Sequence, residues 1–211
     1  MLVVFDVDGT LLDVDSSWRY LHERLGTWHL GRVYAERFFR GEISYEEWAR
    51  LDASLWKGLP IQRLRGLIEE IPYVDGALET LRTLKRAGCR VALLSAGLTL
   101  ATDRICRDTP VDYAVANEVL ARNGVVSGEV RVNVRYSEKG KVLREILKRF
   151  GVKPSQCAVV GDDETLIPAF KIAGLAIAFN PKTEKVSKNA HITIKTKNLS
   201  KTIPHLLKQK I

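Results

Sequence analysis

Residues 2–10 read LVVFDVDGT, and this stretch decides the fold class of the chain. Its first part, Leu2–Phe5, is a short apolar run that ends at two acidic residues, Asp6 and Asp8. A short apolar run without polar alternation is typical of a strand buried on both faces of a parallel sheet. Ligands of such sheets bind beyond the carboxyl ends of the strands, which is where the two aspartates are expected.

The same arrangement of an apolar run and a polar cluster recurs twice. Cys89–Leu94 is followed by the cluster Ser95-Ala96-Gly97, and Cys157–Val160 by the cluster Gly161-Asp162-Asp163. Further strands are expected at Tyr113–Ala116, Leu175–Phe179 and His191–Ile194. Because parallel strands end at one edge of a sheet, all three polar clusters are expected to meet there.

Helical patterns separate these strands. Asp75–Ala87 has apolar residues at helical spacing and ends at Gly88, with Asp75 as the expected N-cap. Glu138–Phe150 has the same character and ends at Gly151. The alternation of strands and helices predicts an α/β fold, a doubly wound parallel sheet. Asn123-Gly124, between two apolar pairs, predicts a small β-hairpin with a type I′ turn.

Residues 15–74 differ in character from the rest. They contain all four tryptophans, show no strand pattern, and read as helices broken near Gly26, Gly41 and Pro60. The simplest interpretation is a helical cap inserted into a core formed by residues 1–14 and 75–211. The tryptophans are expected to form the interior of this cap rather than a ligand site.

Length and composition indicate a globular protein of one core with a modest accessory domain. The chain has 211 residues, of which 45% are hydrophobic and 27% charged. Its three cysteines form no close-spaced pair, which favours reduced, buried thiols. No apolar run suits a signal peptide or a membrane span, so we expect a cytoplasmic protein without a membrane partner. The sequence is also compatible with a homodimer.

The net charge of +8 is concentrated in one part of the chain. Residues 182–211 contain eight lysines and a single glutamate, whereas residues 13–74 are close to neutral. The lysines are scattered and have no aromatic residues between them on which bases would stack. We therefore interpret the tail as a solvated surface, and binding to nucleic acid is not expected.

The spacing of Asp6 and Asp8 carries chemical information. In an extended chain, residues two apart point to the same side, so the two carboxylates would lie close together. Their repulsion requires a cation or a shared proton nearby. The alternative is an ordinary Asp- and Gly-rich turn that closes a strand.

The three polar clusters, taken in order, resemble the motifs of the haloacid dehalogenase superfamily. The similarity is greatest to its phosphoserine phosphatase branch and runs the length of the chain, including the cap, the hairpin and Glu138-Lys139-Gly140. The resemblance implies that Asp6 is the nucleophile and accepts the phosphoryl group as an aspartyl phosphate. It also implies that Asp8 protonates the leaving oxygen and later activates water.

The resemblance further implies a magnesium ion and a set of phosphate ligands. Asp6, the backbone carbonyl of Asp8 and Asp162 would hold Mg²⁺. Ser95 and the N–H of Ala96 would bind the phosphoryl oxygens, and Lys139 would pair with both the phosphate and Asp6. In isolation, Ser95 would be interpreted as a helix N-cap and Lys139 as a solvated lysine. Lys141 is an alternative for the lysine role, but Gly140 follows Lys139 as in the family's Lys-Gly pair.

The fourth motif departs from the family pattern. Leu166 and Thr165 occupy the places of the second aspartate and of the asparagine before it. Asp163 could support the metal instead, which makes it a fourth candidate metal residue. It could equally be an acidic N-cap, favoured by the helix dipole.

The cap departs from the pattern too. Asp15 occupies the place of the glutamate that binds the substrate amine, and Asp52 that of the arginine that binds the substrate carboxylate. Arg50 lies two positions away, about 200° around a helix, and so on another face. Asp52 would repel the carboxylate of phosphoserine, whereas Asp15 and Asp52 can both accept hydrogen bonds, so neutral or hydroxyl-rich phosphomonoesters are expected.

Together, these features predict a Mg²⁺-dependent phosphomonoester hydrolase that acts on a small phosphorylated metabolite. The main alternative is a binding or regulatory protein that kept the fold but lost catalytic strength, which Leu166 and Thr165 would favour. A dehalogenase is a weaker alternative, because that chemistry has no use for Asp8 or for a metal.

Overall fold

The computed structural model describes residues 1–208, and its centre is a seven-stranded sheet. The strands are β1 (Leu2–Phe5), β2 (Arg90–Leu98), β3 (Tyr113–Arg122), β4 (Val125–Arg131), β5 (Cys157–Gly161), β6 (Leu175–Phe179) and β7 (Ile192–Ile194). Their order is β4-β3-β2-β1-β5-β6-β7, and every neighbouring pair is parallel except β3 with β4. The predicted doubly wound α/β sheet is confirmed. The strand order reverses between β1 and β5, where sheets of this kind bind ligands.

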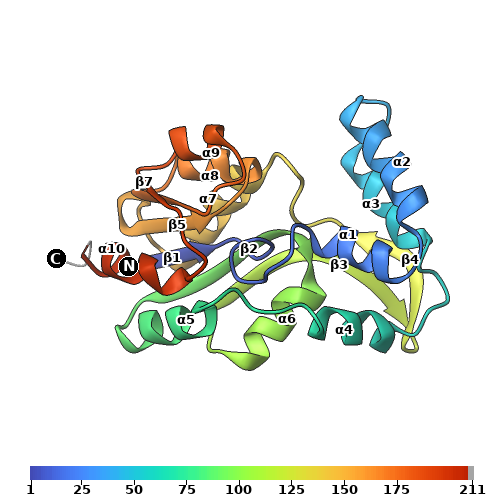
Figure 1. The fold of residues 1–211 in the computed structure, drawn as a ribbon, viewed down its shortest axis with the longest axis horizontal. Helices are drawn as coiled ribbons and strands as arrows, with labels where there is room; N and C mark the ends of the chain where they lie inside the picture. The colour runs from blue at the N-terminus through green and yellow to red at the C-terminus, as the bar shows by residue number, and fades with distance from the viewer. Residues whose placement is uncertain (209–211) are drawn as a thin grey trace.

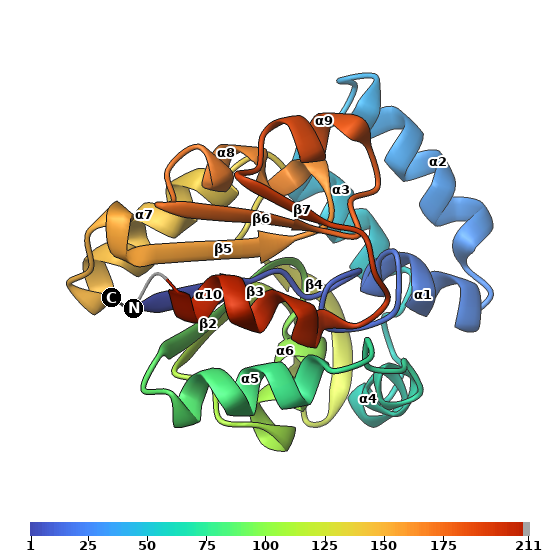
Figure 2. The same cartoon turned by 60° about the vertical axis from the view of Figure 1, so that its left-hand side comes forward.

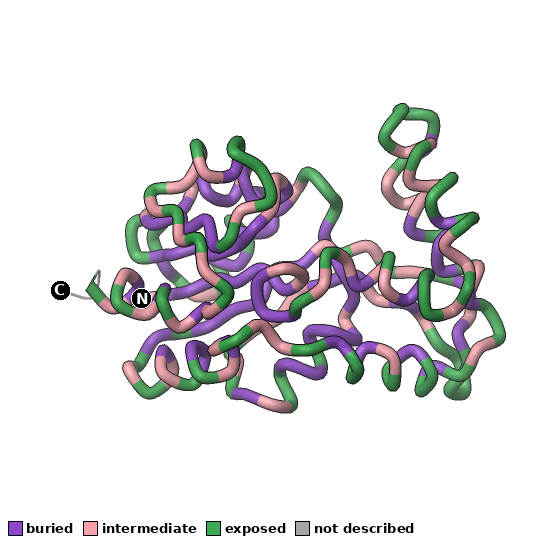
Figure 3. Tube along the Cα trace, viewed as in Figure 1, coloured by how far each residue is buried: buried purple, intermediate pink, exposed green. Residues whose placement is uncertain are grey.

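Helices cover both faces of the sheet (Figures 1 and 2). One face carries α5 (Ala77–Arg86), α6 (Thr99–Asp108) and α10 (Ile203–Lys208). The other carries α7 (Lys139–Phe150), α8 (Ile167–Phe170) and α9 (Glu184–Lys188). The alternation of β1 separates the two cores: Val3 and Phe5 pack with α5, whereas Leu2 and Val4 pack with α7. The central strands β1, β5 and β6 are therefore buried along their whole length, whereas the edge strand β4 keeps exposed positions, and Figure 3 shows this buried centre.

The segment after β1 forms four helices, which are α1 (Ser17–Arg24), α2 (Trp28–Phe39), α3 (Tyr45–Ser54) and α4 (Ile61–Glu69). Gly26 and Gly41 have positive φ between successive helices, and Pro60 directly precedes α4, so the predicted breaks are confirmed. In Figure 1, α2 and α3 project from the body of the molecule beyond one end of the sheet. α4 instead packs beside α6.

Several boundaries differ from the sequence-based expectation. β2 continues to Leu98, and β3 continues to Arg122 because it pairs with β4 in the predicted hairpin. Asn123 and Gly124 both have positive φ, as a type I′ turn requires. Asp75 is not the N-cap of α5; the cap is Gly76, whose left-handed backbone begins the helix. Short 3₁₀ turns complete the chain at Pro154–Gln156, Glu164–Leu166 and Leu199–Thr202.

The remaining sequence expectations concern the surface and the cysteines. Lys185, Lys188 and Lys195 of the basic tail are exposed. Cys89 and Cys157 are buried free thiols, but Cys106 is exposed, which corrects the expectation for that residue. Within residues 1–208, no helix has the length and apolar character needed to cross a bilayer.

Candidate active site

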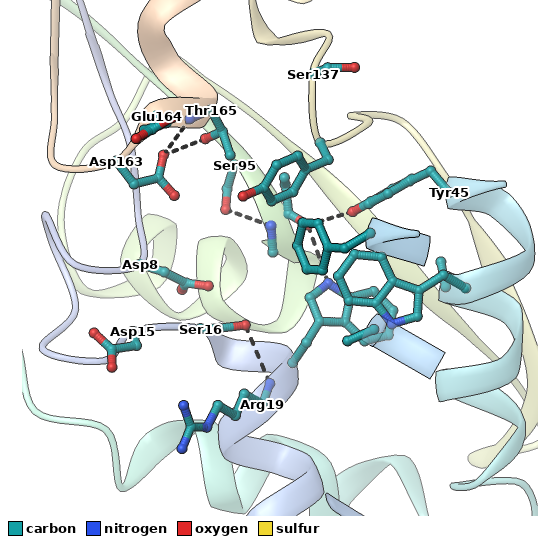
Figure 4. A pocket seen from close by; sticks show the side chains of 18 of the residues that line it. Asp8, Asp15, Ser16, Arg19, Tyr45, Ser95, Ser137, Asp163, Glu164 and Thr165 are labelled. Carbon is teal, nitrogen blue, oxygen red and sulfur yellow. Dashed lines mark hydrogen bonds between the residues drawn. The ribbon is translucent and has the colours of Figure 1, made fainter. Parts of the chain in front are cut away.

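The three polar clusters meet in one pocket at the carboxyl edge of the sheet. Its volume is about 710 Å³. Its lining includes Asp6 and Asp8 after β1, Ser95 in β2 and Lys139 at the start of α7. α1, α2 and α3 supply the opposite wall. Figure 4 shows Asp8, Ser95 and Asp163 around one part of this pocket and Tyr45 across it.

Asp6 and Lys139 form a buried ion pair at the base of the pocket. The Lys139 Nζ lies 2.6 Å from Asp6 Oδ2, and the side chains are 2% and 4% exposed. Burial raises the pKa of Asp6 to about 7, against the lowering effect of the Lys139 charge. The second oxygen, Oδ1, accepts a hydrogen bond from the Val7 N–H. Lys139 is thus not a solvated lysine, whereas the rival Lys141 is exposed.

Asp8 is held by a residue that the sequence analysis did not single out. Its Oδ2 accepts hydrogen bonds from the backbone N–H and the hydroxyl of Ser17, both at 2.8 Å. Its Oδ1 is buried and has no hydrogen-bond partner among residues 1–208. Burial raises the pKa of Asp8, which favours a carboxyl that can carry a proton. Ser17 therefore engages one carboxylate oxygen of Asp8 and leaves the other unengaged.

Asp162 lies against the turn that follows β1. Its Oδ1 accepts a hydrogen bond from the Thr10 hydroxyl at 3.1 Å, and its Oδ2 lies 3.0 Å from Lys182 Nζ. A Cβ on Gly9 would come within 2.0 Å of Asp162 Oδ2, so only glycine allows this approach. Lys182 follows β6 and was also missed by the sequence analysis. Its position after a parallel strand is the signal that could have found it.

The structure shows what Asp163 and Leu166 do in the fourth motif, where the sequence left Asp163 as either a metal support or an N-cap. Asp163 Oδ1 accepts hydrogen bonds from the backbone N–H and the hydroxyl of Thr165, so this carboxylate caps the 3₁₀ turn. Its other oxygen is not used in that cap, and its charge raises the pKa of Asp6. Leu166 is wholly buried in the core and offers no ligand atom.

The acidic residues have the chemistry that a magnesium ion requires. Mg²⁺ binds hard oxygen ligands and keeps several waters, so few protein ligands are needed. Asp6, Asp162 and Asp163 interact electrostatically across a short distance, and each added negative charge raises the pKa of Asp6. Across residues 1–208, no three His, Cys, Asp or Glu side chains form a cluster of metal-binding geometry. A smaller set made of the Asp6 and Asp162 carboxylates and the Asp8 backbone carbonyl would be an oxygen-only donor set of the kind that Mg²⁺ binds together with water.

Residues 95–97, near the end of β2, are fixed through one carbonyl oxygen. The Ala96 carbonyl accepts hydrogen bonds from Trp18 Nε1, the Tyr45 hydroxyl and Asn117 Nδ2, at 3.2, 3.2 and 2.8 Å. Ser95 is not a helix N-cap, because its Oγ accepts from the Gly97 N–H and α6 begins only at Thr99. The three donors to the Ala96 carbonyl come from α1, α3 and β3, so this end of β2 is held from both walls of the pocket.

Asp15 and Asp52 lie in different environments. The Asp15 side chain is 82% exposed at the pocket rim, 3.9 Å from Lys182. Asp52 is buried on α3, where its Oδ1 lies 3.3 Å from Nε2 of the buried His22. Arg50 is exposed and is not among the residues that line the pocket.

The tryptophans are only partly the interior packing that the sequence suggested. Trp56 is wholly buried and stacks on Trp18 at 5.6 Å. Trp18 packs against the same core and also lines the pocket, whereas Trp28 and Trp48 are half-buried and line the pocket, which corrects the expectation for those two. Helical spacing alone does not show which side of α1, α2 or α3 faces the pocket. The sequence therefore could not distinguish tryptophans of the interior from tryptophans of the pocket wall.

Comparisons with known proteins agree with this geometry. The family model for haloacid dehalogenase-like hydrolase matches residues 3–170. The chain belongs to this family. Solved structures of related proteins have a similar fold. One, described as a substrate-bound phosphoserine phosphatase complex, superposes with a TM-score of 0.82 at 30% identity and covers 97% of each chain.

The related sequences are phosphoserine phosphatases. The enzyme of Methanocaldococcus jannaschii is 31% identical over 97% of both chains. That of Archaeoglobus fulgidus is 35% identical over 86% of this chain, which spans only 53% of that relative's length. A further solved structure, 30% identical with a TM-score of 0.82, is described as a phospho-aspartyl intermediate analogue of phosphoserine phosphatase; it covers 97% of this chain and 98% of its own.

Proposed function

We propose that this hydrolase-family member is a Mg²⁺-dependent phosphomonoesterase that forms an aspartyl phosphate on Asp6. The observation that carries the proposal is the buried pair of Asp6 and Lys139, 2.6 Å apart, beside the partnerless Oδ1 of Asp8. The relative described as a phospho-aspartyl intermediate analogue supports the same chemistry. We further propose that residues 15–74 act as a cap, because α1, α2 and α3 contribute one wall of the pocket.

In the first step, Asp6 attacks phosphorus and the leaving alkoxide departs with a proton from Asp8. Lys139 neutralises charge on Asp6 and on the incoming phosphoryl group, because an anionic nucleophile cannot otherwise approach a dianion. Ser95 Oγ and the N–H of Ala96 bind phosphoryl oxygens. Asp8 can supply the proton because burial raises the pKa of its carboxyl.

In the second step, Asp8 accepts a proton from water, which attacks the aspartyl phosphate and regenerates Asp6. Asp6, Asp162 and the carbonyl of Asp8 would hold Mg²⁺, with Asp163 nearby as a candidate support. The ion would supply positive charge to the phosphoryl group. Ser17 keeps Asp8 oriented through both steps by its two hydrogen bonds to Oδ2.

Removal of the metal should abolish turnover. A screen over phosphorylated sugars, amino acids, glycerates and nucleotides should reveal activity with Mg²⁺ that EDTA removes and added Mg²⁺ restores. The physical reason is that Asp6, Asp162 and Asp163 otherwise concentrate negative charge where a dianion must bind. Binding of Mg²⁺ can be checked separately by calorimetry on the apoprotein. Full activity in EDTA would contradict the metal assignment but leave Asp6 as nucleophile open.

Phosphoserine should be a poor substrate. The place that would need a cation for its carboxylate holds Asp52, and a charge-assisted hydrogen bond there would be worth about 1.5–3 kcal/mol. Asp52→Arg should therefore raise kcat/KM for L-phosphoserine relative to a neutral phosphomonoester, by about 10-fold or more. The measurement is the ratio of the two kcat/KM values. The highest kcat/KM of the panel for L-phosphoserine in the unmodified enzyme would show that another side chain binds the carboxylate.

A further inference from the structure

Three polar atoms on the cap side of the pocket lack hydrogen-bond partners. Within residues 1–208 these are His22 Nε2, Trp48 Nε1 and Asp52 Oδ1, all buried. His22 lies on α1, and Trp48 and Asp52 lie one helical turn apart on α3. All three residues line the pocket. We name them the inner polar group.

The members of this group face one another without completing hydrogen bonds. His22 Nε2 is 3.3 Å from Asp52 Oδ1, but the direction of the N–H does not satisfy hydrogen-bond geometry. Burial raises the pKa of Asp52, and the N–H groups of His22 and then of Trp48 oppose that rise. A buried donor or acceptor whose hydrogen bonds are incomplete destabilises the free protein, and a ligand that completes them removes this cost. Three such atoms at one place therefore indicate a site that a ligand completes.

The other ring nitrogen of His22, Nδ1, already has a hydrogen-bond partner. Its Nδ1 lies 2.8 Å from the Thr27 hydroxyl, which accepts a hydrogen bond from Trp56 Nε1 at 3.3 Å. The Thr27 hydroxyl can donate to Nδ1, and in that tautomer Nε2 is the donor of the ring. His22 and Trp48 are then the donors of the group, and Asp52 is its acceptor.

The walls around this group are aromatic. Trp18, Trp28, Phe39 and Tyr45 line the same pocket. Each basic side chain in the pocket lining already has an acidic partner. The pairs are Arg19 with Glu23, Lys139 with Asp6, Lys182 with Asp162 and Lys185 with Glu164. Among the described residues, every positive charge in the pocket lining is therefore offset by a neighbouring acid.

We propose that the inner polar group recognises a hydroxyl group on the leaving-group side of the substrate. The substrate class is a phosphomonoester of a small diol or polyol that carries a free hydroxyl distant from the phosphate. This inference rests on the proposed phosphatase function and names the substrate of that same site.

A hydroxyl matches the group better than the other polar ends of small metabolites. It can donate to Asp52 and accept from Trp48 or His22 at the same time. An ammonium only donates, so it leaves both N–H groups unmatched. A carboxylate only accepts, and it would lie against the Asp52 carboxyl with no cation to offset the repulsion.

The test uses a matched series of phosphate esters. Alkyl, ω-hydroxyalkyl and ω-aminoalkyl phosphates of equal chain length, from ethyl to pentyl, are compared by kcat/KM with Mg²⁺ present. At the chain length that reaches the group, the hydroxyl should raise kcat/KM about 10- to 100-fold over the alkyl ester. The amino ester should fall below the hydroxy ester. No hydroxyl advantage at any length, or an amino ester that exceeds the hydroxy ester, would overturn the proposal.

Variants test whether the higher kcat/KM of the hydroxy ester depends on the inner polar group. Trp48→Phe removes one N–H and keeps the ring, and Asp52→Asn replaces the carboxylate with an amide. Each should reduce the hydroxy-to-alkyl ratio toward one, whereas Asp103→Asn, at an exposed position on α6, should keep it. Circular dichroism establishes folding, and the two variants test the group independently. A ratio that neither folded variant changes would contradict the assignment.

Equilibrium binding separates this inference from the proposed function. Calorimetry with the same esters and the Asp6→Asn variant measures the hydroxyl preference without turnover. If no ester is hydrolysed, the proposed function fails, while a tighter hydroxy ester would still support the inner polar group. If esters are hydrolysed but neither kinetics nor binding prefers the hydroxyl, the inference fails and the phosphatase assignment stands.

Discussion

The Asp6→Asn variant should lose at least about 1,000-fold in kcat, because its neutral amide cannot attack phosphorus. It should also lose the ion pair with Lys139, which is 2.6 Å long and buried. Beryllium fluoride, which mimics an aspartyl phosphate, should form an adduct with Asp6 of the unmodified enzyme and none with the variant. The kinetics are measured with p-nitrophenyl phosphate and with the best ester of the panel.

A matched control separates chemistry from folding. Asp13→Asn alters an exposed aspartate of the same segment and should leave kcat near its original value. Circular dichroism and thermal melting establish whether Asp6→Asn is folded, since Lys139 is then buried without its principal partner. Near-native turnover by folded Asp6→Asn would reject Asp6 as the nucleophile.

The Asp8→Asn variant should lose activity to an extent that depends on the leaving group. An alkyl alkoxide needs a proton, so hydrolysis of alkyl esters should slow by about 100- to 10,000-fold. Nitrophenolate leaves without protonation, so the first step with p-nitrophenyl phosphate should largely survive. Water activation should still be impaired, so phosphoenzyme should accumulate.

Rapid-quench kinetics check this second expectation. A burst of nitrophenolate followed by slow turnover would be the signature of a trapped aspartyl phosphate. The structural basis is the free Oδ1 of Asp8, whose other oxygen is occupied by Ser17. Equal losses for alkyl and nitrophenyl esters, without a burst, would show that Asp8 is not the acid.

The sequence predicted the sheet well because its signals are local. Leu2–Phe5 is apolar without alternation, and the buried strand β1 has those same bounds. The Asn123-Gly124 turn was equally readable, since few residues tolerate its positive φ. The helix breaks at Gly26 and Gly41 followed the same logic.

The contacts inside the site were less accessible to sequence reasoning. Ser17 reads as part of a helix start, yet its hydroxyl reaches Asp8 because the chain folds back after β1. Asn117 lies in a strand that seemed to end at Ala116, so its hydrogen bond to the Ala96 carbonyl was invisible. Such contacts depend on distances between separate segments, which residue spacing does not encode.

The connection between α3 and α4 limits how the helical region can swing. Gly58 N–H donates to the Val126 carbonyl, Val126 N–H to the Leu59 carbonyl and Ile61 N–H to the Gly124 carbonyl, at 2.9–3.0 Å. These backbone hydrogen bonds join the short connection to the edge of the β3–β4 hairpin, much as a further strand would be joined. A rigid rotation of the whole segment 15–74 would have to break those three hydrogen bonds. Any displacement of α1 and α2 that keeps these hydrogen bonds must therefore leave residues 58–61 in place beside the hairpin.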